Sequence, residues 1–319
     1  MTVMRGLLAA CAWLTLSMSS ALSADFPDRP VTIIVGYNAG GGTDIVARTI
    51  AEALSKRWGQ RVLVENRPGA QGSIGVRALK AASGDGYTLG VWSTSDVGNA
   101  AIQDKLGYDL VQDFEHVSQL AAGATVLAVK AALPAQDFAE YVAYATAHKG
   151  QLNVAVVSGG DLHLDTVRIN RAAKIETAII GYPGTAPGLT DVVAGHSDAI
   201  LLPLAPAIPH IKSGAIRAIA VGSLQRSPAL PDVKALAETI PGLESTFFYG
   251  MVAPKGTPAA ILTKISAAVN EAIGEPELQK KFEALGFAAS ASSPEAFKTM
   301  VAKKLEVSRD IAREAGMRR

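Results

Sequence analysis

The stretch Val31-Thr32-Ile33-Ile34-Val35-Gly36-Tyr37-Asn38-Ala39-Gly40-Gly41-Gly42-Thr43-Asp44 decides the fold class. Its first part, Val31–Gly36, is almost entirely apolar, as expected for a strand buried on both faces of a parallel sheet. A glycine-rich turn follows, and apolar residues then recur at helical spacing along Asp44–Trp58. Short apolar strands alternate with helical patterns along the rest of the chain. This order predicts an α/β protein with a parallel sheet and helices on both faces.

Composition excludes several classes of partner. The chain has 319 residues, and 30 lysines and arginines balance 29 aspartates and glutamates, which leaves a formal charge of +1. This balance argues against duplex DNA or an acidic membrane surface as the main partner. An aromatic content of 6% also argues against stacking on single-stranded nucleic acid. Hydrophobic residues make up 49% of the chain, enough for a large core, and the length fits two domains or one bilobed domain.

The first 24 residues differ from the rest of the chain. Arg5 is followed by the apolar run Gly6–Leu16, and small residues offer a cleavage site at or just before Ala24. The apolar run is too short to span a membrane, so the pattern predicts a cleavable signal peptide over 1–24. Cys11 is the only cysteine, and the alternative of a lipoprotein cleavage box there has too short an apolar core. A mature chain without it has no disulfide and no thiolate metal site.

Two later turns repeat the arrangement of the first. Val157–Leu162 and Gly181–Thr185 each follow a predicted strand and precede a predicted helix. Ligands of open parallel sheets bind beyond the carboxyl ends of the strands, where such turns gather. Glycines let backbone N–H groups approach a bound group, and the helix N-terminus behind them favours negative charge. Together the three turns predict an anion-binding cleft, although each one alone could be a simple tight connection.

Other chemistries fit the sequence poorly. Gly42 stands where a phosphate-binding loop needs lysine, and no G-x-G-x-x-G motif follows a strand, so we expect no nucleotide cofactor. The five histidines lack paired metal-ligand spacing. A secreted hydrolase using Ser158, Asp161 and His163 is the enzyme alternative. The sequence has no nucleophile elbow, however, and nothing in it brings these side chains together. We therefore expect no catalysis, no metal and no cofactor.

Several longer motifs carry a resemblance to a known family. Besides the first turn, they are Phe26-Pro27-Asp28-Arg29-Pro30-Val31, Val64-Glu65-Asn66-Arg67-Pro68-Gly69-Ala70, Gly84-Asp85-Gly86-Tyr87-Thr88-Leu89, Gln225-Arg226-Ser227-Pro228-Ala229-Leu230-Pro231-Asp232-Val233 and Ala253-Pro254-Lys255-Gly256-Thr257-Pro258. In this order the motifs resemble those of the Bug family, the periplasmic solute-binding proteins of tripartite tricarboxylate transporters. The resemblance covers essentially the whole chain after the signal segment.

The resemblance implies a two-lobed periplasmic-binding-protein fold of the Venus flytrap kind, type II-like, with the ligand cleft between the lobes. The first lobe would comprise 25–125 and 248–319, and the second lobe 126–247. Two strands, at about 124–129 and 247–252, would cross between the lobes. The resemblance also implies a periplasmic location and a small carboxylate ligand, held by backbone amides and ordered waters.

Carried over by position, the resemblance implies a ligand site shared by both lobes. In the first lobe it comprises Asn38, Ala39, Gly40, Gly41, Thr43, Asp44, Ser93, Thr94, Ser95 and Asp96. In the second lobe it comprises Ser158, Gly159, Gly160, Asp161, His163, Tyr182, Gly184 and Thr185. Asp44 has an alternative, structural role at the start of its helix, where a carboxylate can accept hydrogen bonds from backbone N–H groups.

Departures from the family pattern lead to a hypothesis about the ligand. Asn38 stands where the family commonly has proline, and Pro183 stands where it often has lysine. Asp96 and Asp161 add negative charge, and a like-charge contact in a desolvated cleft is costly. We therefore hypothesise an amino- or amide-bearing ligand, or a monocarboxylate with a neutral tail, rather than a tricarboxylate. The alternative is that both aspartates point to solvent.

The implied function is that of a periplasmic receptor. We expect the chain, acting as a monomer, to close its two lobes on a small organic acid or a related metabolite. It would then deliver the ligand to the subunits of a tripartite-type membrane permease. Closure is a hinge motion whose populations the ligand shifts. The alternative is a sensor that presents its closed state to a membrane sensor protein, since the binding half would be identical.

Overall fold

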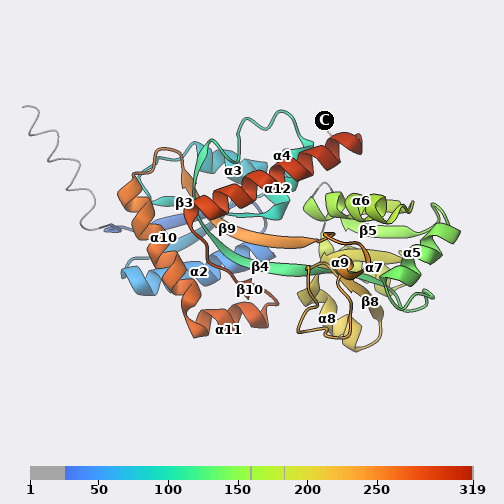
Figure 1. Ribbon diagram of the computed structural model, residues 1–319. Coiled ribbons are helices and arrows are strands. Elements are labelled where there is room, and N and C mark those ends of the chain that lie inside the picture. The colour runs from blue at the N-terminus through green and yellow to red at the C-terminus, as the bar shows by residue number, and fades with distance from the viewer. Residues whose placement is uncertain (1–25, 159, 183, 318–319) are drawn as a thin grey trace, which may run out of the picture.

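Two α/β lobes lie side by side in the computed structural model, joined by two long strands (Figure 1). The structure describes residues 26–158, 160–182 and 184–317. The predicted signal peptide, Cys11, Gly159 and Pro183 lie outside the described residues. Among the helices that are described, none is both long enough and apolar enough to cross a membrane.

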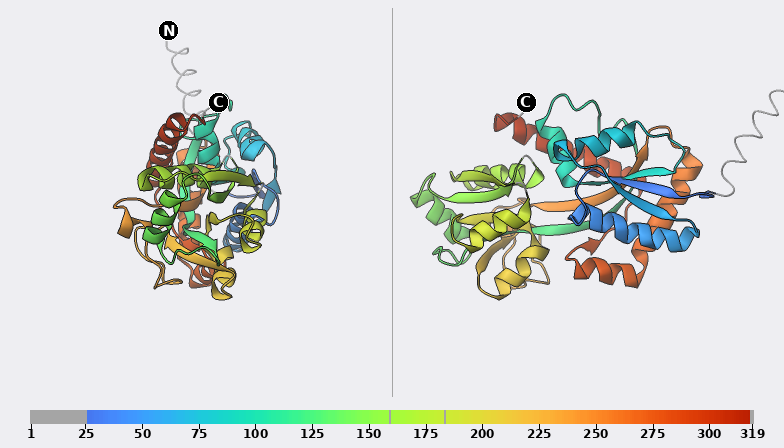
Figure 2. Two further views of the ribbon diagram at one scale, coloured as in Figure 1. Left: turned by 90° about the vertical axis from the view of Figure 1, so that its right-hand side faces the viewer. Right: turned by 180° about the vertical axis from the view of Figure 1, so that it is seen from behind.

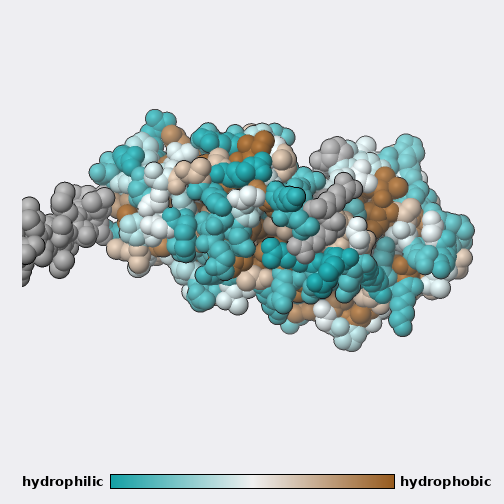
Figure 3. All heavy atoms as spheres, turned by 90° about the horizontal axis from the view of Figure 1, so that it is seen from above, coloured by the Kyte–Doolittle hydropathy of each residue, from teal (hydrophilic) through white to brown (hydrophobic). Residues whose placement is uncertain are grey.

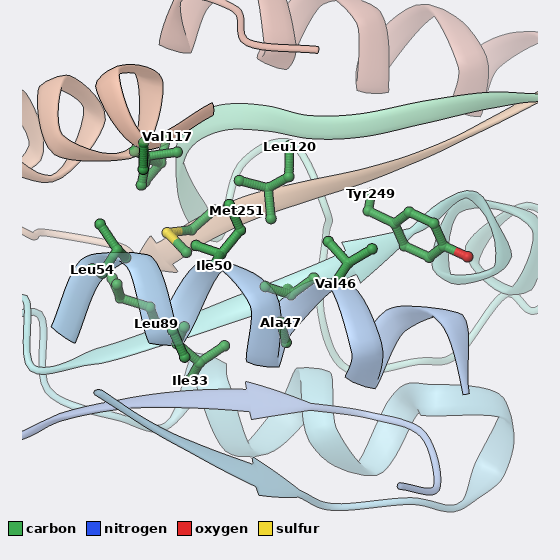
Figure 4. Packing of buried hydrophobic residues seen from close by; sticks show 14 of the residues in the cluster. Ile33, Val46, Ala47, Ile50, Leu54, Leu89, Val117, Leu120, Tyr249 and Met251 are labelled. Atoms are coloured by element: carbon green, nitrogen blue, oxygen red, sulfur yellow. The ribbon is translucent and has the colours of Figure 1, made fainter. Parts of the chain in front are cut away.

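The first lobe begins with three parallel strands. The central strand β1 pairs with β2 on one side and with β3 on the other. The glycine-rich turn after β1 leads into α2, as predicted, and α2 packs its apolar face against the sheet (Figure 4). The elements are β1 (Val31–Val35), α2 (Gly42–Trp58), β2 (Val62–Asn66), α3 (Ser73–Lys80), β3 (Thr88–Ser93) and α4 (Thr94–Ile102).

Two long strands connect the lobes. The first half of β4 (Phe114–Lys130) pairs antiparallel with β9 (Thr246–Pro254), and its second half pairs with β7 and β8 of the second lobe. Both crossing strands are present, but β4 begins about ten residues earlier than the sequence predicts. Polar residues such as Glu115 and Gln119 interrupt the apolar pattern there. Pairing with β9 therefore makes this part of the strand.

The sheet that runs through both lobes is mixed. Its strand order is β2-β1-β3-β9-β4-β7-β5-β6, with β8 and β10 paired to β4. Strand β9 is antiparallel to β3, and β4 is antiparallel to β9 and β7. The predicted parallel pairing is therefore present in each lobe, but the sheet as a whole is not parallel. Each lobe keeps its own parallel portion, and the crossing strands insert antiparallel pairs between the two portions.

The second lobe repeats the strand–turn–helix units of the first. Strand β5 pairs parallel with β6 and with β7, so the turns after β5 and β6 leave the same edge of the sheet. The elements are α5 (Phe138–Ala147), β5 (Asn153–Val157), α6 (Asp161–Ala173), β6 (Ala178–Tyr182), α7 (Thr185–Val193), β7 (Ala199–Pro203), α8 (Leu204–Lys212), β8 (Ile216–Val221) and α9 (Leu236–Thr239).

After β9 the chain returns to the first lobe. It forms α10 (Ala259–Gly274), α11 (Pro276–Ala284), β10 (Ala288–Ala289) and α12 (Pro294–Glu314). The last helix packs on β4 and α4, and its C-terminal end reaches over α6 of the second lobe (Figures 1 and 2). The C-terminal helix therefore bridges the two lobes on one side of the crossing strands.

Each lobe has its own hydrophobic core. Ile33, Ile50 and Met251 are fully buried in a first-lobe cluster, while Val154 and Leu201 belong to a second-lobe cluster. On the face seen from above, hydrophilic residues predominate and apolar residues form small separate groups (Figure 3). The predicted lobe boundaries at 125/126 and 247/248 fall within β4 and β9, and they stay a prediction.

Three helices lack a clear signal in the sequence. Helix α8 contains Pro209 in its interior, and α11 starts with Pro276 directly after α10. Helix α4 contains Gly98 and Asn99, which are poor helix formers. Finding α4 matters for function, because it places the predicted site residues Thr94, Ser95 and Asp96 on the first turn of a helix rather than on a loop.

Candidate functional site

In the first lobe, the glycine-rich turn after β1 adjoins the turn between β3 and α4. The turn after β1 starts at Tyr37, and α4 starts with Asp96 in its first turn. The Tyr37 hydroxyl and the Asp96 Oδ1 atom lie 2.9 Å and 2.7 Å from the position that a Cβ on Gly72 would take. The hydroxyl and the carboxylate therefore lie close to each other beside Gly72, where the two turns meet.

The turns of the second lobe also adjoin each other, and one of them faces the first lobe. The backbone N–H of Ser158 donates to the carbonyl of Tyr182 at 3.0 Å, which ties the turn after β5 to the end of β6. A Cβ on Gly160 would lie 3.9 Å from the Ser95 Oγ atom of the first lobe. The four turns therefore form one continuous region between the lobes.

Three helices in this region begin without a side-chain cap among the described residues. The N-cap residues of α2, α6 and α7 are Gly41, Gly160 and Gly184. By contrast, α5 and α12 begin elsewhere and are capped by the side chains of Asp137 and Ser293. Without a capping side chain, the first N–H groups of a helix are available to an outside acceptor. The region thus presents helix N-termini from both lobes.

The lobes touch at the start of α6. A Cβ on Gly98 of α4 would lie 2.5 Å from the backbone nitrogen of Asp161 and 2.9 Å from the carbonyl carbon of Gly160. Real side chains do not approach backbone atoms so closely, so only glycine fits at residue 98 in this arrangement. The close approach explains why a residue that disfavours helices lies in the middle of α4.

Asp44 is directed into its own lobe. Its buried carboxylate accepts hydrogen bonds from the Gly40 N–H at 2.8 Å, the Arg48 Nε–H at 2.9 Å and the Asn66 side-chain amide at 2.9 Å. Burial alone would raise the pKa of Asp44, but the hydrogen bonds from Arg48, Gly40 and Asn66 lower it below its usual value. This geometry supports the structural alternative, in which Asp44 fixes the shape of the turn.

Asp96 is also used within the first lobe. It accepts hydrogen bonds from the Ser93 N–H at 2.8 Å and from the Ser93 hydroxyl at 3.2 Å, as part of a capping box at the start of α4. Burial raises the pKa of Asp96 to about 6, against the opposing effect of the hydrogen bonds from Ser93. The side chain is 2% exposed, so it does not point to solvent.

Asp161 faces the other lobe. Its carboxylate is 2% exposed, and its Oδ1 atom lies 3.2 Å from the Nζ atom of Lys304 in α12. Neither carboxylate oxygen accepts a hydrogen bond within the described part of the chain. The carboxylate therefore does not orient His163, and the hydrolase triad of Ser158, Asp161 and His163 is not assembled. The alternative in which Asp96 and Asp161 point to solvent is wrong for both residues, since each is 2% exposed.

Ser158 and His163 line a cavity between the lobes. The cavity has a volume of about 850 Å³, and the first lobe contributes Gln71 and Gln103 to its wall. His163 is half-buried, and burial lowers the pKa of its imidazole below the usual value, which favours the neutral ring. The cavity adjoins the turn after β5, so these two predicted residues lie where a ligand could reach them.

Tyr182 is anchored to its own lobe. Its hydroxyl donates to the carboxylate of Asp191, which also accepts from the Ser197 hydroxyl at 2.9 Å. The Tyr182 hydroxyl is therefore engaged in fixing the end of β6, directly before the turn that leads to α7. Any contact of Tyr182 with a ligand would use its ring or its backbone.

The remaining predicted residues differ in exposure. Buried members are Thr43, Ser93 and Thr94, and half-buried members are Ser95, Gly160, Gly184 and Thr185. The exposed members are Asn38, Ala39, Gly40, Gly41 and Ser158. The exposed and half-buried residues are those on the surface of the turns, where they are accessible to a ligand.

Lys304 is the clearest residue that sequence reasoning missed. It lies on the last helix, far along the chain from Asp161, and no local motif connects the two. The only sequence signal is its place on an amphipathic helix, which does not distinguish it from neighbouring lysines. Gln71 and Gln103 were missed because both lie outside the family motifs.

Comparisons with known proteins agree with this architecture. A family described as the tripartite tricarboxylate transporter family receptor matches residues 46–317. The chain belongs to this family. Protein BugT of Bordetella pertussis is 30% identical over 308 residues, which cover 95% of this chain and 94% of BugT.

Two solved structures are similar over nearly the whole chain. R. palustris Rpa4515 with adipate has a TM-score of 0.82 and 30% identity, covering 92% of this chain and 99% of that one. MatC from Rhodopseudomonas palustris with bound malate has a TM-score of 0.78 and 29% identity, covering 90% of this chain and 100% of that one. The chain is thus a periplasmic solute-binding receptor of the Bug type with the two-lobed fold, and its relatives are binding proteins rather than enzymes.

Proposed function

We propose that this receptor captures a small carboxylate between its lobes and delivers it to a membrane permease of the tripartite type. The observation that carries the proposal is the set of glycine-capped helices α2, α6 and α7, which begin at the same region from two lobes. Helix N-termini bind carboxylates through their free N–H groups and because the positive end of the helix macrodipole lies there. The adipate and malate held by two relatives support this ligand class.

The ligand contacts we propose come from the turns rather than from acidic side chains. They are Asn38, Ala39, Gly40, Gly41, Ser95, Ser158, Gly160, His163, Gly184 and Thr185. The carboxylates of Asp44 and Asp96 accept hydrogen bonds inside the first lobe, and that of Asp161 faces Lys304. None of the three needs to meet the ligand, so their charge does not have to be matched by a ligand amine.

The charge of the ligand follows from the same contacts. The hypothesis of an amino- or amide-bearing ligand rested on open negative charge at Asp96 and Asp161. Because both are buried and have partners in the protein, we propose a mono- or dicarboxylate instead, with an amino-bearing acid as the rival outcome. Isothermal titration calorimetry with adipate, malate, aspartate, glutamine and citrate separates these classes. Tight binding of glutamine alone, or of none of the acids, would contradict the proposal.

The role of backbone N–H groups is tested by Thr185→Pro. Thr185 is the first residue of α7, where proline is tolerated by the helix but removes one N–H donor. We expect the affinity for the best acid of the panel to fall about tenfold or more, because a hydrogen bond to a charged group contributes about 1.5–3 kcal/mol. The matched control is Ala259→Pro at the first residue of α10, outside the four turns, which should leave the affinity unchanged.

Delivery to a permease is tested separately from binding. The ligand-loaded receptor is crosslinked to membranes of its own organism, and captured proteins are identified by mass spectrometry. Recovery of permease subunits supports delivery, and recovery of a membrane sensor protein supports the sensing alternative. The Thr185→Pro variant serves as the control with impaired loading.

A further inference from the structure

Two carboxylates of the second lobe are buried at the lobe interface. Asp161 and Asp165 lie one turn apart on α6 and are 2% exposed each. Lys304 of α12 faces both of them, with its Nζ atom 3.2 Å from Asp161 and 3.7 Å from Asp165. The lysine side chain is 22% exposed. Two negative charges of one lobe thus share one lysine of the other lobe.

The two carboxylates differ in their other partners. Asp165 accepts hydrogen bonds from the Ser245 hydroxyl at 2.6 Å and from Arg168 at 3.0 Å. Within the described part of the chain, neither carboxylate oxygen of Asp161 accepts a hydrogen bond. The positive charge that faces this carboxylate is that of Lys304, 3.2 Å away. Helix α4 contributes Gly98 at this contact, and its own carboxylate, Asp96, is occupied by Ser93. Asp161 therefore depends on the other lobe.

Lobe separation would change the environment of these groups. The carboxylates belong to α6 and the lysine to α12, so opening the lobes moves them apart and returns Asp161 to water. Closing the lobes buries the two carboxylates, and a buried carboxylate without a partner is strongly unfavourable. The lysine offsets this cost only when the lobes are together.

We propose that Lys304 is a positioning residue that permits the lobes to close, by neutralising Asp161 and Asp165 across the interface. A second part of the inference rests on the proposed function: the same contact prepares the ligand site. Asp161 is the first residue of α6, and without Lys304 its negative charge would repel a carboxylate bound at the Gly160 turn. Lys304 removes that repulsion in the closed arrangement. Closure and carboxylate binding are thereby coupled through one side chain that touches no ligand.

Protonation adds a pH dependence to closure. Burial, together with the nearby Asp165, raises the pKa of Asp161 to about 7, although Lys304 and Arg168 oppose the rise. These are the charged groups that face Asp161 from α6 and α12. In an open molecule the carboxyl is hydrated and keeps its ordinary, lower pKa. The closed form therefore holds the proton more tightly, so acidification favours closure and a pH above 7 opposes it.

Single-molecule fluorescence transfer between the lobes tests the proposal without ligand. In a Cys11→Ser background, dyes are attached at Ala81→Cys and Ala147→Cys, two exposed sites, one on each lobe. We expect Lys304→Met to reduce the closed-to-open ratio at pH 8 at least tenfold, and Lys304→Arg to keep most of it. The matched control is Lys303→Met, an exposed neighbour on the same helix, which should change nothing.

The second arm follows pH. The closed fraction of the unsubstituted receptor should fall between pH 5.5 and 8.5, and Asp161→Asn should abolish this dependence. An unchanged ratio in Lys304→Met, an equal loss in Lys303→Met, or full pH dependence in Asp161→Asn would each overturn the proposal. The fluorescence experiment uses no ligand, so a negative result would not contradict carboxylate binding. Likewise, absence of carboxylate binding in the calorimetry would not change the measured effect of Lys304 on lobe closure.

Discussion

Two turns of similar sequence place their aspartates in opposite environments. In the first lobe, Gly40 to Asp44 precede and begin α2, and in the second lobe Gly160 and Asp161 begin α6. Asp44 accepts three hydrogen bonds from its own lobe, and its pKa is lowered. Asp161 faces the other lobe, accepts no hydrogen bond within the described residues, and has its pKa raised to about 7.

The difference shows that aspartate has two roles beside one cleft: Asp44 fixes a turn within its lobe, and Asp161 makes a contact between the lobes. Asp44 makes its turn rigid whether the lobes are open or closed, because all its partners move with it. Asp161 gains its partner only on closure, so it reports on and influences the position of the lobes. A preformed half-site and a closure-dependent half-site are what a hinge-closing receptor needs.

The largest expected effect is on the rigid turn. Asp44→Ala removes the buried carboxylate to which Gly40, Arg48 and Asn66 all donate hydrogen bonds. We expect the free energy of unfolding at pH 7 to fall by about 3 kcal/mol. Urea denaturation followed by circular dichroism measures it.

A surface aspartate provides the matched control. Asp310 is paired with Arg313 on the exposed side of α12. We expect Asp310→Ala to change the free energy of unfolding by less than about 0.5 kcal/mol. Equal losses in the two variants would mean that the inward network does not stabilise the turn.

The second expected effect concerns pH and Asp161. Its pKa is higher in the folded closed protein than in the unfolded chain, so the folded form binds the proton more tightly from about pH 4 to about pH 7. Its contribution to stability is therefore lost as pH rises through that window. The free energy of unfolding of Asp161→Asn should therefore increase relative to that of the unsubstituted receptor as the pH rises from 4 to 7.

The contribution of Asp44 to the free energy of unfolding depends on pH in the opposite direction. Its pKa is lowered on folding, so its contribution is present above the unfolded pKa and lost as pH falls through the folded one. Urea denaturation of both Asn variants across pH 3 to 8 compares the two turns directly. Parallel pH profiles for Asp44→Asn and Asp161→Asn would remove the contrast between them.

The smallest expected effect concerns the contact between α4 and α6. Gly98→Ala should favour α4 itself by up to about 1 kcal/mol, since alanine is the better helix former. Its Cβ would nevertheless collide with the backbone of Asp161, so the lobes should move apart. We expect the closed-to-open ratio to fall about tenfold, or about 1.4 kcal/mol, without loss of overall stability. Gly274→Ala, at the open end of α10, is the control that should leave the ratio unchanged.

Much of the fold follows from local sequence. The apolar run of β1 and the helical spacing of α2 match their observed bounds to within two residues, and the two later turns lie between a strand and a helix as predicted. The first half of β4 and the helices α4, α8 and α11 were not predicted, because polar residues, glycine or proline interrupt their patterns or because the helix directly follows another one. Tertiary pairing and packing overrode those weak local preferences.

For the site, the sequence indicated which turns lie near the cleft but not where their side chains point. The glycine caps at Gly41, Gly160 and Gly184 fall within the predicted turns. The directions of Asp96 and Asp161 could not be predicted, because they depend on Tyr37 beside one and Lys304 beside the other. These contacts join elements that are distant in the chain.

The sequence by itself determined the strand–turn–helix units, their glycine-rich starts and the family, since each depends on residues that are close together in the chain. Only the tertiary structure decided which carboxylates are neutralised, and by which residues. The ion pair of Asp161 with Lys304 exists because α6 of the second lobe and α12 of the first meet at the lobe interface. A buried charge stabilises the closed form only if a group across the interface offsets its cost of desolvation, and that group is known only from the tertiary structure.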